Sequence, residues 1–97
     1  MTTEDIVLSP EKIQTKLPDM CSVVLYNDDY TPAEFVIEIL NRFFGFNTES
    51  AIQLMVKIHN DGSGVCGIYT RDIAETKVSQ VGDFAKANEQ PTRCSLR

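Results

Sequence analysis

Apolar residues along the chain follow two periodicities, one typical of strands and one typical of helices. Three short runs rich in β-branched, aromatic and other apolar residues predict strands, at residues 21–26, 65–69 and 92–96. Three longer stretches with apolar residues three and four positions apart predict helices, at residues 32–44, 48–60 and 71–88. The predicted order is therefore β-α-α-β-α-β.

Each predicted helix has a stripe of residues that share one face at helical spacing, and we expect the stripe of the third helix to be buried. In the first helix the stripe comprises Phe35, Val36, Ile39, Leu40, Phe43 and Phe44. In the second it comprises Ile52, Met55, Val56 and His59. In the third it comprises Ile73, Val78, Val81, Phe84 and Ala85.

Residues at the helix ends support these boundaries. Thr31 is a good N-cap, Pro32 suits the first helical position, and Glu34 completes a capping box. The later helix boundaries are marked by Gly45 as a left-handed C-terminal residue, by Asn47 or Thr48 as a cap, and by Thr70 as a cap.

The pattern predicts an α+β fold, because three strands with so few helices do not form βαβ units. We expect a small three-stranded antiparallel sheet with three helices on one face; the sheet order does not follow from the pattern. The 97 residues make one domain. Residues 1–19 are polar, contain two prolines and predict a flexible N-terminal tail, which leaves 20–97 as the core domain.

Composition narrows the class of protein. A net charge of −5 argues against nucleic acid as a partner, and no apolar run approaches the roughly 20 residues of a membrane span. The three cysteines are odd in number and form no CxxC motif. They fit unpaired thiols in a reducing compartment, so we expect a cytoplasmic protein, or a plastid stromal one if a transit peptide has been removed.

The candidate binding residues lie at the corner between the first strand and the first helix. Asn27, Asp28 and Asp29 offer several oxygen acceptors, which suits a small cation with several N–H donors such as an ammonium group. An ordinary turn is the alternative, because Asn and Asp are common turn residues. A calcium loop is disfavoured, since Tyr30 and Pro32 break the EF-hand pattern.

Catalysis and metal binding have little support. Cys66 and His59 offer a nucleophile and a base, but no third residue that would orient them is identifiable. One histidine and three scattered cysteines lack the paired spacing of a zinc site. We therefore expect no catalytic residue, no metal and no cofactor.

The short connection between the first two helices predicts that they pack as antiparallel neighbours. The end of the second helix would then bring Met55 and His59 near Asn27 and Asp28. A concavity with a polar rim and an apolar floor suits a peptide that begins with a large hydrophobic residue.

The same residues form motifs that resemble the ClpS family. The motifs are Asn27-Asp28-Asp29-Tyr30-Thr31-Pro32 followed by Glu34-Phe35-Val36, Ala51-x-Gln53-Leu54-Met55 with His59, Cys66-Gly67, Ala74-Glu75-Thr76-Lys77-Val78, and Asn88-Glu89-x-Pro91. They follow one another in unbroken order across about residues 20–97.

The resemblance implies an adaptor rather than an enzyme, with an α/β core behind a flexible tail. Such adaptors recognise N-degrons, which are substrates with N-terminal Phe, Tyr, Trp or Leu, and deliver them to a Clp AAA+ unfoldase of ClpA or ClpC type. By resemblance, the α-amine would be held by Asn27, Asp28 and His59. The side-chain pocket would be formed by Leu25, Thr31, Ala33, Val36, Met55, Ile58 and Thr92. The unfoldase would be contacted by Asp72 and Lys77. We also expect a monomer.

Two residues depart from the family pattern. Family members often carry methionine at the position of Ala33, at the pocket entrance, and leucine at the position of Thr92. Both changes would widen the pocket. The alternative to an adaptor is a small α+β interaction domain of ribosomal-stalk type, which does not read N-termini.

Overall fold

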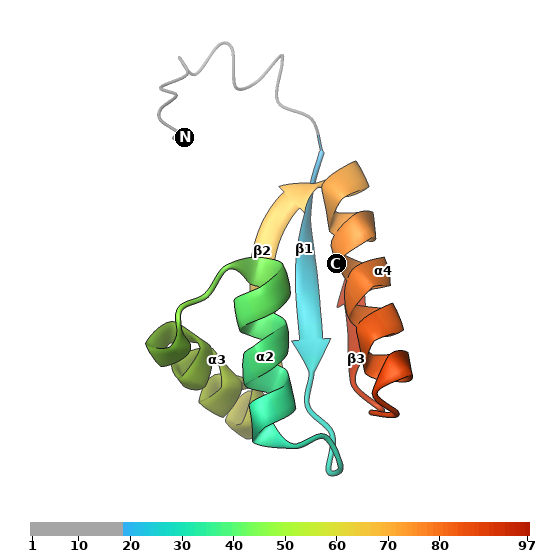
Figure 1. Cartoon of the computed structure of the whole chain (residues 1–97). Coiled ribbons are helices and arrows are strands. Elements are labelled where there is room, and N and C mark those ends of the chain that lie inside the picture. The colour runs from blue at the N-terminus through green and yellow to red at the C-terminus, as the bar shows by residue number, and fades with distance from the viewer. Residues whose placement is uncertain (1–18) are drawn as a thin grey trace.

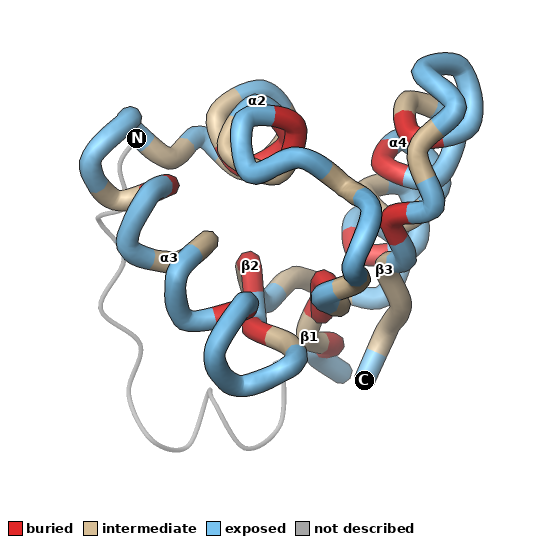
Figure 2. The backbone as a smooth tube through the Cα atoms, turned by 90° about the horizontal axis from the view of Figure 1, so that it is seen from below, coloured by how far each residue is buried: buried red, intermediate tan, exposed pale blue. Residues whose placement is uncertain are grey.

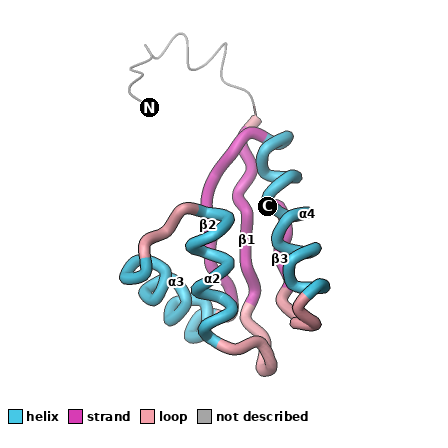
Figure 3. The backbone as a smooth tube through the Cα atoms, viewed as in Figure 1, coloured by secondary structure: helices cyan, strands magenta, loops and turns pink. Residues whose placement is uncertain are grey.

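The computed structural model describes residues 19–97 and confirms the predicted fold class and element order (Figures 1 and 3). The elements in chain order are β1 (Met20–Tyr26), α2 (Ala33–Phe44), α3 (Thr48–Asp61), β2 (Ser63–Thr70), α4 (Arg71–Ala87) and β3 (Arg93–Leu96).

Strand β1 is the middle strand of the sheet. It pairs antiparallel with both neighbours, giving the order β2-β1-β3. All three helices lie on one face of this sheet (Figure 2), and the side chains of Val23 and Leu25 are wholly buried. Among the described residues no helix covers the opposite face, where Met20, Val65 and Ile68 are exposed.

Strand β2 contains a β-bulge and approaches α3 closely. Val23 pairs with Gly67 while Val24 pairs with Val65, so Cys66 is the extra residue, and it is buried. Gly64 lies against α3, since a Cβ there would come within 2.8 Å of Ile58 Cγ1. Gly67 therefore lies at the bulge, and Gly64 lies at a close approach to α3.

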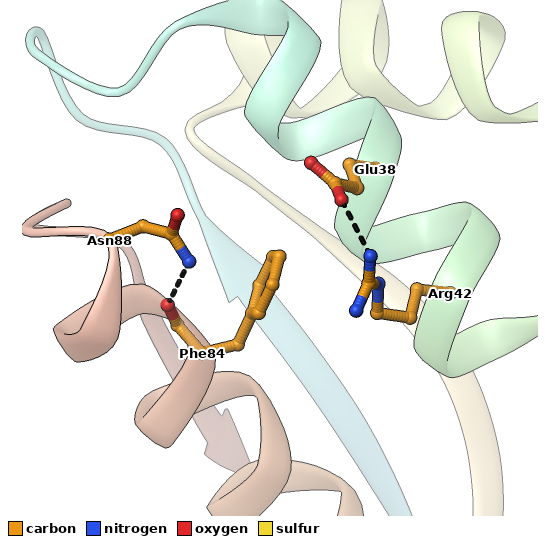
Figure 4. A network of polar contacts seen from close by, with 4 residues as sticks. All are labelled: Glu38, Arg42, Phe84 and Asn88. Atoms are coloured by element: carbon orange, nitrogen blue, oxygen red, sulfur yellow. Dashed lines mark hydrogen bonds and ion pairs between the residues drawn. The ribbon is translucent and has the colours of Figure 1, made fainter.

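Aromatic packing joins α2 to α4. The rings of Phe35 and Phe84 stack with centroids 5.1 Å apart, and the Arg42 guanidinium lies 4.9 Å from the Phe84 ring centroid. Figure 4 shows the polar contacts around this ring: Arg42 pairs with Glu38 at 2.9 Å, and the Asn88 amide donates to the Phe84 carbonyl at 2.8 Å. Arg42 thus extends the contact between the two helices, whereas the Asn88 bond lies within the C-terminal end of α4.

A lysine of α4 supports the end of α2. Lys77 Nζ donates a 2.6 Å hydrogen bond to the Phe43 carbonyl oxygen, one of the last carbonyls of α2, which lack partners within the helix. The ammonium also lies 5.9 Å from the Phe44 ring centroid and 5.7 Å from that of Tyr69. These contacts give Lys77 a structural role within the domain.

Two helix boundaries agree with their local sequence signals. Gly45 has φ 74°, the left-handed conformation, and its N–H bonds to the Leu40 carbonyl. Asn47 caps α3 by accepting a 2.8 Å hydrogen bond from the Ser50 N–H. Thr70 is the N-cap residue of α4, but its side chain makes no capping hydrogen bond.

The predicted buried stripe of α4 was partly wrong, and the shared face of α3 includes exposed residues. Ile52 and Val56 of α3 are 42% and 45% exposed, and Ile73 of α4 is 49% exposed. The buried positions are instead Ala51 and Ile58 in α3 and Ala74, Val81 and Ala85 in α4. Alanines therefore occupy three of the five buried positions in these two helices.

The predicted tail, residues 1–19, falls almost wholly outside the described residues, which begin at Asp19. In the described part of the chain, no helix is both long enough and apolar enough to cross a membrane.

We expect Phe84→Ala to lower the free energy of unfolding by about 2–4 kcal/mol, because the half-buried ring holds α2 against α4. Tyr30→Ala provides the matched control, since the Tyr30 side chain is 81% exposed, and it should change stability by about 0.5 kcal/mol or less. Urea denaturation of both variants measures the difference. Equal stabilities would show that the stacked ring does not join the helices.

Candidate functional site

Four segments meet at one end of the domain. The end of β1, the start of α2, the end of α3 and the loop before β3 all lie at the lower end of Figure 1. The Asn27 N–H donates a 2.9 Å hydrogen bond to the Gly62 carbonyl, and the Gly62 N–H donates to the Ile58 carbonyl. These bonds attach the loop after β1 to the last turn of α3, which carries His59.

A pocket of about 280 Å³ opens at this junction. It is lined by Tyr26, Asn27, Asp28, Asp29, Thr31, Ala33, Val36, Met55, Ile58 and His59. Val36 comes from α2 and Met55 and Ile58 from α3, so apolar side chains of two helices face the polar residues that follow β1. The volume lies near the lower end of small-ligand pockets, roughly 300–1,000 Å³.

The structure brings together most of the residues that the sequence proposed for the site. Eight of them line the pocket: Asn27, Asp28, Thr31, Ala33, Val36, Met55, Ile58 and His59. The other two do not. Leu25 is wholly buried in the same core cluster as Ile58, and Thr92 is buried with its hydroxyl 2.9 Å from Thr31 Oγ1.

Tyr26 and Asp29 line the pocket as well. The sequence proposed Asp29 as an acceptor at this corner but did not propose Tyr26. Tyr26 is the last residue of β1, and the position of Asp29 beside Asp28 was the available signal. Tyr26 is held by a 2.9 Å hydrogen bond between its hydroxyl and Ser95 Oγ on β3.

The Asp28 carboxylate organises the loop. Its Oδ1 accepts from the N–H groups of Tyr30 and Thr31 at 2.8 and 2.7 Å, and its Oδ2 accepts from the Thr31 hydroxyl at 2.6 Å. The prediction of Thr31 as the helix cap is therefore wrong, because its hydroxyl binds Asp28. Pro32 takes the N-cap position with φ −63° and ψ 148°, and Ala33 is the first helical residue.

These contacts determine the charge state of Asp28. Partial burial alone would raise the pKa of the carboxyl. The hydrogen bonds from the Thr31 hydroxyl and from the N–H groups of Thr31 and Tyr30 outweigh it, so the pKa lies below its ordinary value of 3.8. The rim of the pocket therefore carries a carboxylate at neutral pH.

Cys66 is not suited to nucleophilic catalysis. It is buried in the core, and burial together with the nearby Cys94 raises the pKa of its thiol to about 12. Burial also raises the pKa of Cys94, to about 11. Within residues 19–97, no three His, Cys, Asp or Glu side chains are grouped so that they could hold a metal ion.

The two residues proposed for unfoldase contact lie on the first half of α4. This half lies at the opposite end of the domain from the pocket (Figure 1). Asp72 is exposed, whereas Lys77 is partly buried through its bond to the Phe43 carbonyl.

Comparison with known proteins identifies the family. Residues 16–95 match the family model described as "ATP-dependent Clp protease adaptor protein ClpS". The chain belongs to the ClpS family. It is therefore an adaptor of the ATP-dependent Clp protease and not an enzyme, and this membership favours the adaptor over a ribosomal-stalk-type domain.

Individual ClpS proteins are similar over most of the chain. The ATP-dependent Clp protease adapter protein ClpS of Vibrio atlanticus is 50% identical over 90 residues, covering 93% of this chain and 85% of that protein. The ClpS of Nitrosospira multiformis is 48% identical over 92 residues, covering 95% and 90%. The structure of Agrobacterium tumefaciens ClpS2 bound to L-phenylalaninamide matches with a TM-score of 0.80 and 36% identity, covering 82% of this chain and 96% of that chain.

Removing the Thr31 hydroxyl should raise the pKa of the Asp28 carboxyl. Because the folded-state pKa is lowered, Asp28 stabilises the fold at neutral pH, and this contribution is lost as the pH falls through the folded value. In Thr31→Val the loss should begin at higher pH, while Thr31→Ser should keep the parent behaviour. Carboxyl ¹³C titration by NMR measures the pKa directly. An unchanged value in Thr31→Val would show that the hydroxyl does not stabilise the carboxylate.

Proposed function

We propose that this ClpS-family chain binds the free α-ammonium group and the large hydrophobic first side chain of N-degron substrates. It acts as a cytoplasmic monomer and delivers them to a Clp AAA+ unfoldase of ClpA or ClpC type. The supporting observation is that one pocket combines the Asp28 carboxylate at its rim with the apolar side chains of Val36, Met55 and Ile58.

The polar residues suit an ammonium group. Asp28 Oδ1 already accepts two hydrogen bonds and Oδ2 accepts one, while an ionised carboxylate has about four acceptor positions. The fourth position is available to a ligand. The side-chain oxygen of Asn27 and the ring of His59 are further polar groups among the lining residues, so three groups are available for the three N–H bonds of one ammonium.

The apolar residues suit the side chain next to that ammonium. A volume of about 280 Å³ admits one large side chain and excludes a folded segment of a protein. L-Phenylalaninamide, bound by the ClpS2 structure that this chain resembles, has both features, a free α-amine and an aromatic side chain. The likeness supports the same ligand class for this chain.

The remaining parts of the proposal concern delivery. Asp72 and Lys77 on α4 contact the unfoldase, so substrate and unfoldase bind at opposite ends of the domain (Figure 1). In this proposal the unfoldase grips residues 1–19, and residues 20–97 form the core domain.

A peptide that begins with Phe should bind much more tightly than the same peptide with acetyl-Phe. Charge-assisted hydrogen bonds contribute about 1.5–3 kcal/mol each, so the loss of two weakens binding about a hundredfold or more. Fluorescence anisotropy with labelled peptides measures the ratio, and a peptide that begins with Ala controls for the side chain. Equal affinity for the Phe and acetyl-Phe peptides would overturn the proposed function.

Ala33 should make the pocket tolerant of β-branched first residues. Ala33 is exposed and lines the pocket, and a methionine there would narrow the entrance. Ala33→Met should weaken binding of Ile- and Val-initiated peptides by about 1–3 kcal/mol, the scale of steric misfit, while Phe binding is kept. Glu34→Met adds the same side chain at a position that does not line the pocket and should change none of these affinities. A uniform change across all peptides would show that Ala33 is not a gate.

A further inference from the structure

Thr92 is the one buried polar side chain among residues 19–97, with 8% of its surface exposed. Buried hydroxyl groups need a hydrogen-bond partner. The partner of Thr92 is Thr31, whose Oγ1 lies 2.9 Å from Thr92 Oγ1 although the two residues are 61 positions apart. Thr92 does not line the pocket itself, but it is hydrogen-bonded to Thr31, which does.

The direction of the hydrogen bonds follows from the number of protons. Thr31 Oγ1 also lies 2.6 Å from Asp28 Oδ2, and an ionised carboxylate only accepts hydrogen bonds. The single hydroxyl proton of Thr31 is therefore donated to Asp28. Since Thr31 has no second proton, Thr92 must be the donor to Thr31, and the chain of donors runs from Thr92 through Thr31 to Asp28.

We propose that Thr92 is a positioning residue for the Asp28 carboxylate, acting through the Thr31 hydroxyl. The proposal rests on the proposed function, in which Asp28 binds the ligand's ammonium group. A hydroxyl that receives a hydrogen bond donates more strongly, and a hydroxyl held at both ends cannot rotate. Thr92 therefore keeps Oδ2 of Asp28 fixed and leaves its remaining acceptor position directed at the ligand.

The backbone before β3 places Thr92 for this contact. The Gln90 N–H donates to the Ala85 carbonyl at 2.8 Å, and Glu89 has a left-handed φ of 57°, so the chain turns sharply after α4. The next residue after Thr92, Arg93, pairs with Tyr26 at the end of β1. Thr92 is held between the end of α4 and the sheet, so its hydroxyl has a defined position.

This role differs from the one that the resemblance suggested. An aliphatic residue at position 92 would be a pocket wall, and threonine would then only widen the pocket. The observed contact indicates that threonine differs from leucine at this position chiefly by its hydroxyl group, and not by its smaller volume. A substitution that removes the hydroxyl but keeps the size of the side chain distinguishes the positioning role from the role as a pocket wall.

The test compares Thr92→Val, which replaces the hydroxyl by a methyl group, with Thr92→Ser, which keeps the hydroxyl. Two quantities are measured on the full chain: the pKa of the Asp28 carboxyl by ¹³C NMR without peptide, and the affinities of Phe and acetyl-Phe peptides by anisotropy. Thr76→Val is the matched control, because it makes the same change on α4, where the hydroxyl binds the Asp72 carbonyl.

In Thr92→Val we expect the pKa of Asp28 to rise and Phe-peptide binding to weaken about three- to tenfold, the effect of one hydrogen bond. The acetyl-Phe affinity should stay the same, so the ratio of the Phe affinity to the acetyl-Phe affinity should fall by the same three- to tenfold factor. Thr92→Ser and Thr76→Val should match the parent. If Thr92→Val does not fold, Thr92→Ala compared with Thr92→Ser isolates the hydroxyl in the same way.

An unchanged Asp28 pKa and unchanged discrimination in Thr92→Val would overturn the positioning role. So would a loss in Thr92→Ser as large as that in Thr92→Val, since Thr92 would then only fill space. Failure of the proposed function is recognised separately, because the parent protein itself would then bind the Phe and acetyl-Phe peptides equally.

Discussion

The central position of β1 is the constraint on which the structure depends. Because β1 pairs on both edges, its backbone direction and its last residue are fixed by β2 and β3 together. The loop that follows must begin there, and the Asn27 bond to the Gly62 carbonyl attaches it to α3. The pocket residues at the end of β1 and in the loop after it are therefore held by a strand that cannot shift without disrupting the sheet.

The same arrangement explains how a short loop combines two tasks. Asp28 is a turn residue, since three of its hydrogen bonds lie within residues 28–31, and it is also the carboxylate at the pocket rim. The ordinary turn and the binding site were alternatives in the sequence, but the structure makes them compatible. The turn contacts lower the pKa of Asp28 and hold the charge in place before any ligand arrives, and such preorganisation reduces the cost of binding.

Sequence reasoning succeeded where the determining interactions are local. Gly45 and Asn47 act within one turn of the residues they cap, and the six elements follow from periodicity and turn residues. It failed at Thr31 although the competing acceptor, Asp28, lies only three residues away, because the sequence does not decide whether a threonine hydroxyl caps the helix or binds a neighbouring carboxylate. It also misjudged Ile73, which the helical spacing placed in a buried stripe but which is 49% exposed. The sheet order required long-range pairing, which a periodic pattern does not encode.

The bulge in β2 has a consequence for self-association. In the order β2-β1-β3, β2 is an edge strand of eight residues, and its outer backbone groups are a potential template for another chain. The extra residue Cys66 interrupts the regular spacing of those groups and increases the local twist. The backbone N–H and C=O groups of a strand from another chain would not align with those of β2 near the middle of β2. The irregularity that places a thiol in the core thus also discourages edge-to-edge aggregation beside the exposed Val65 and Ile68.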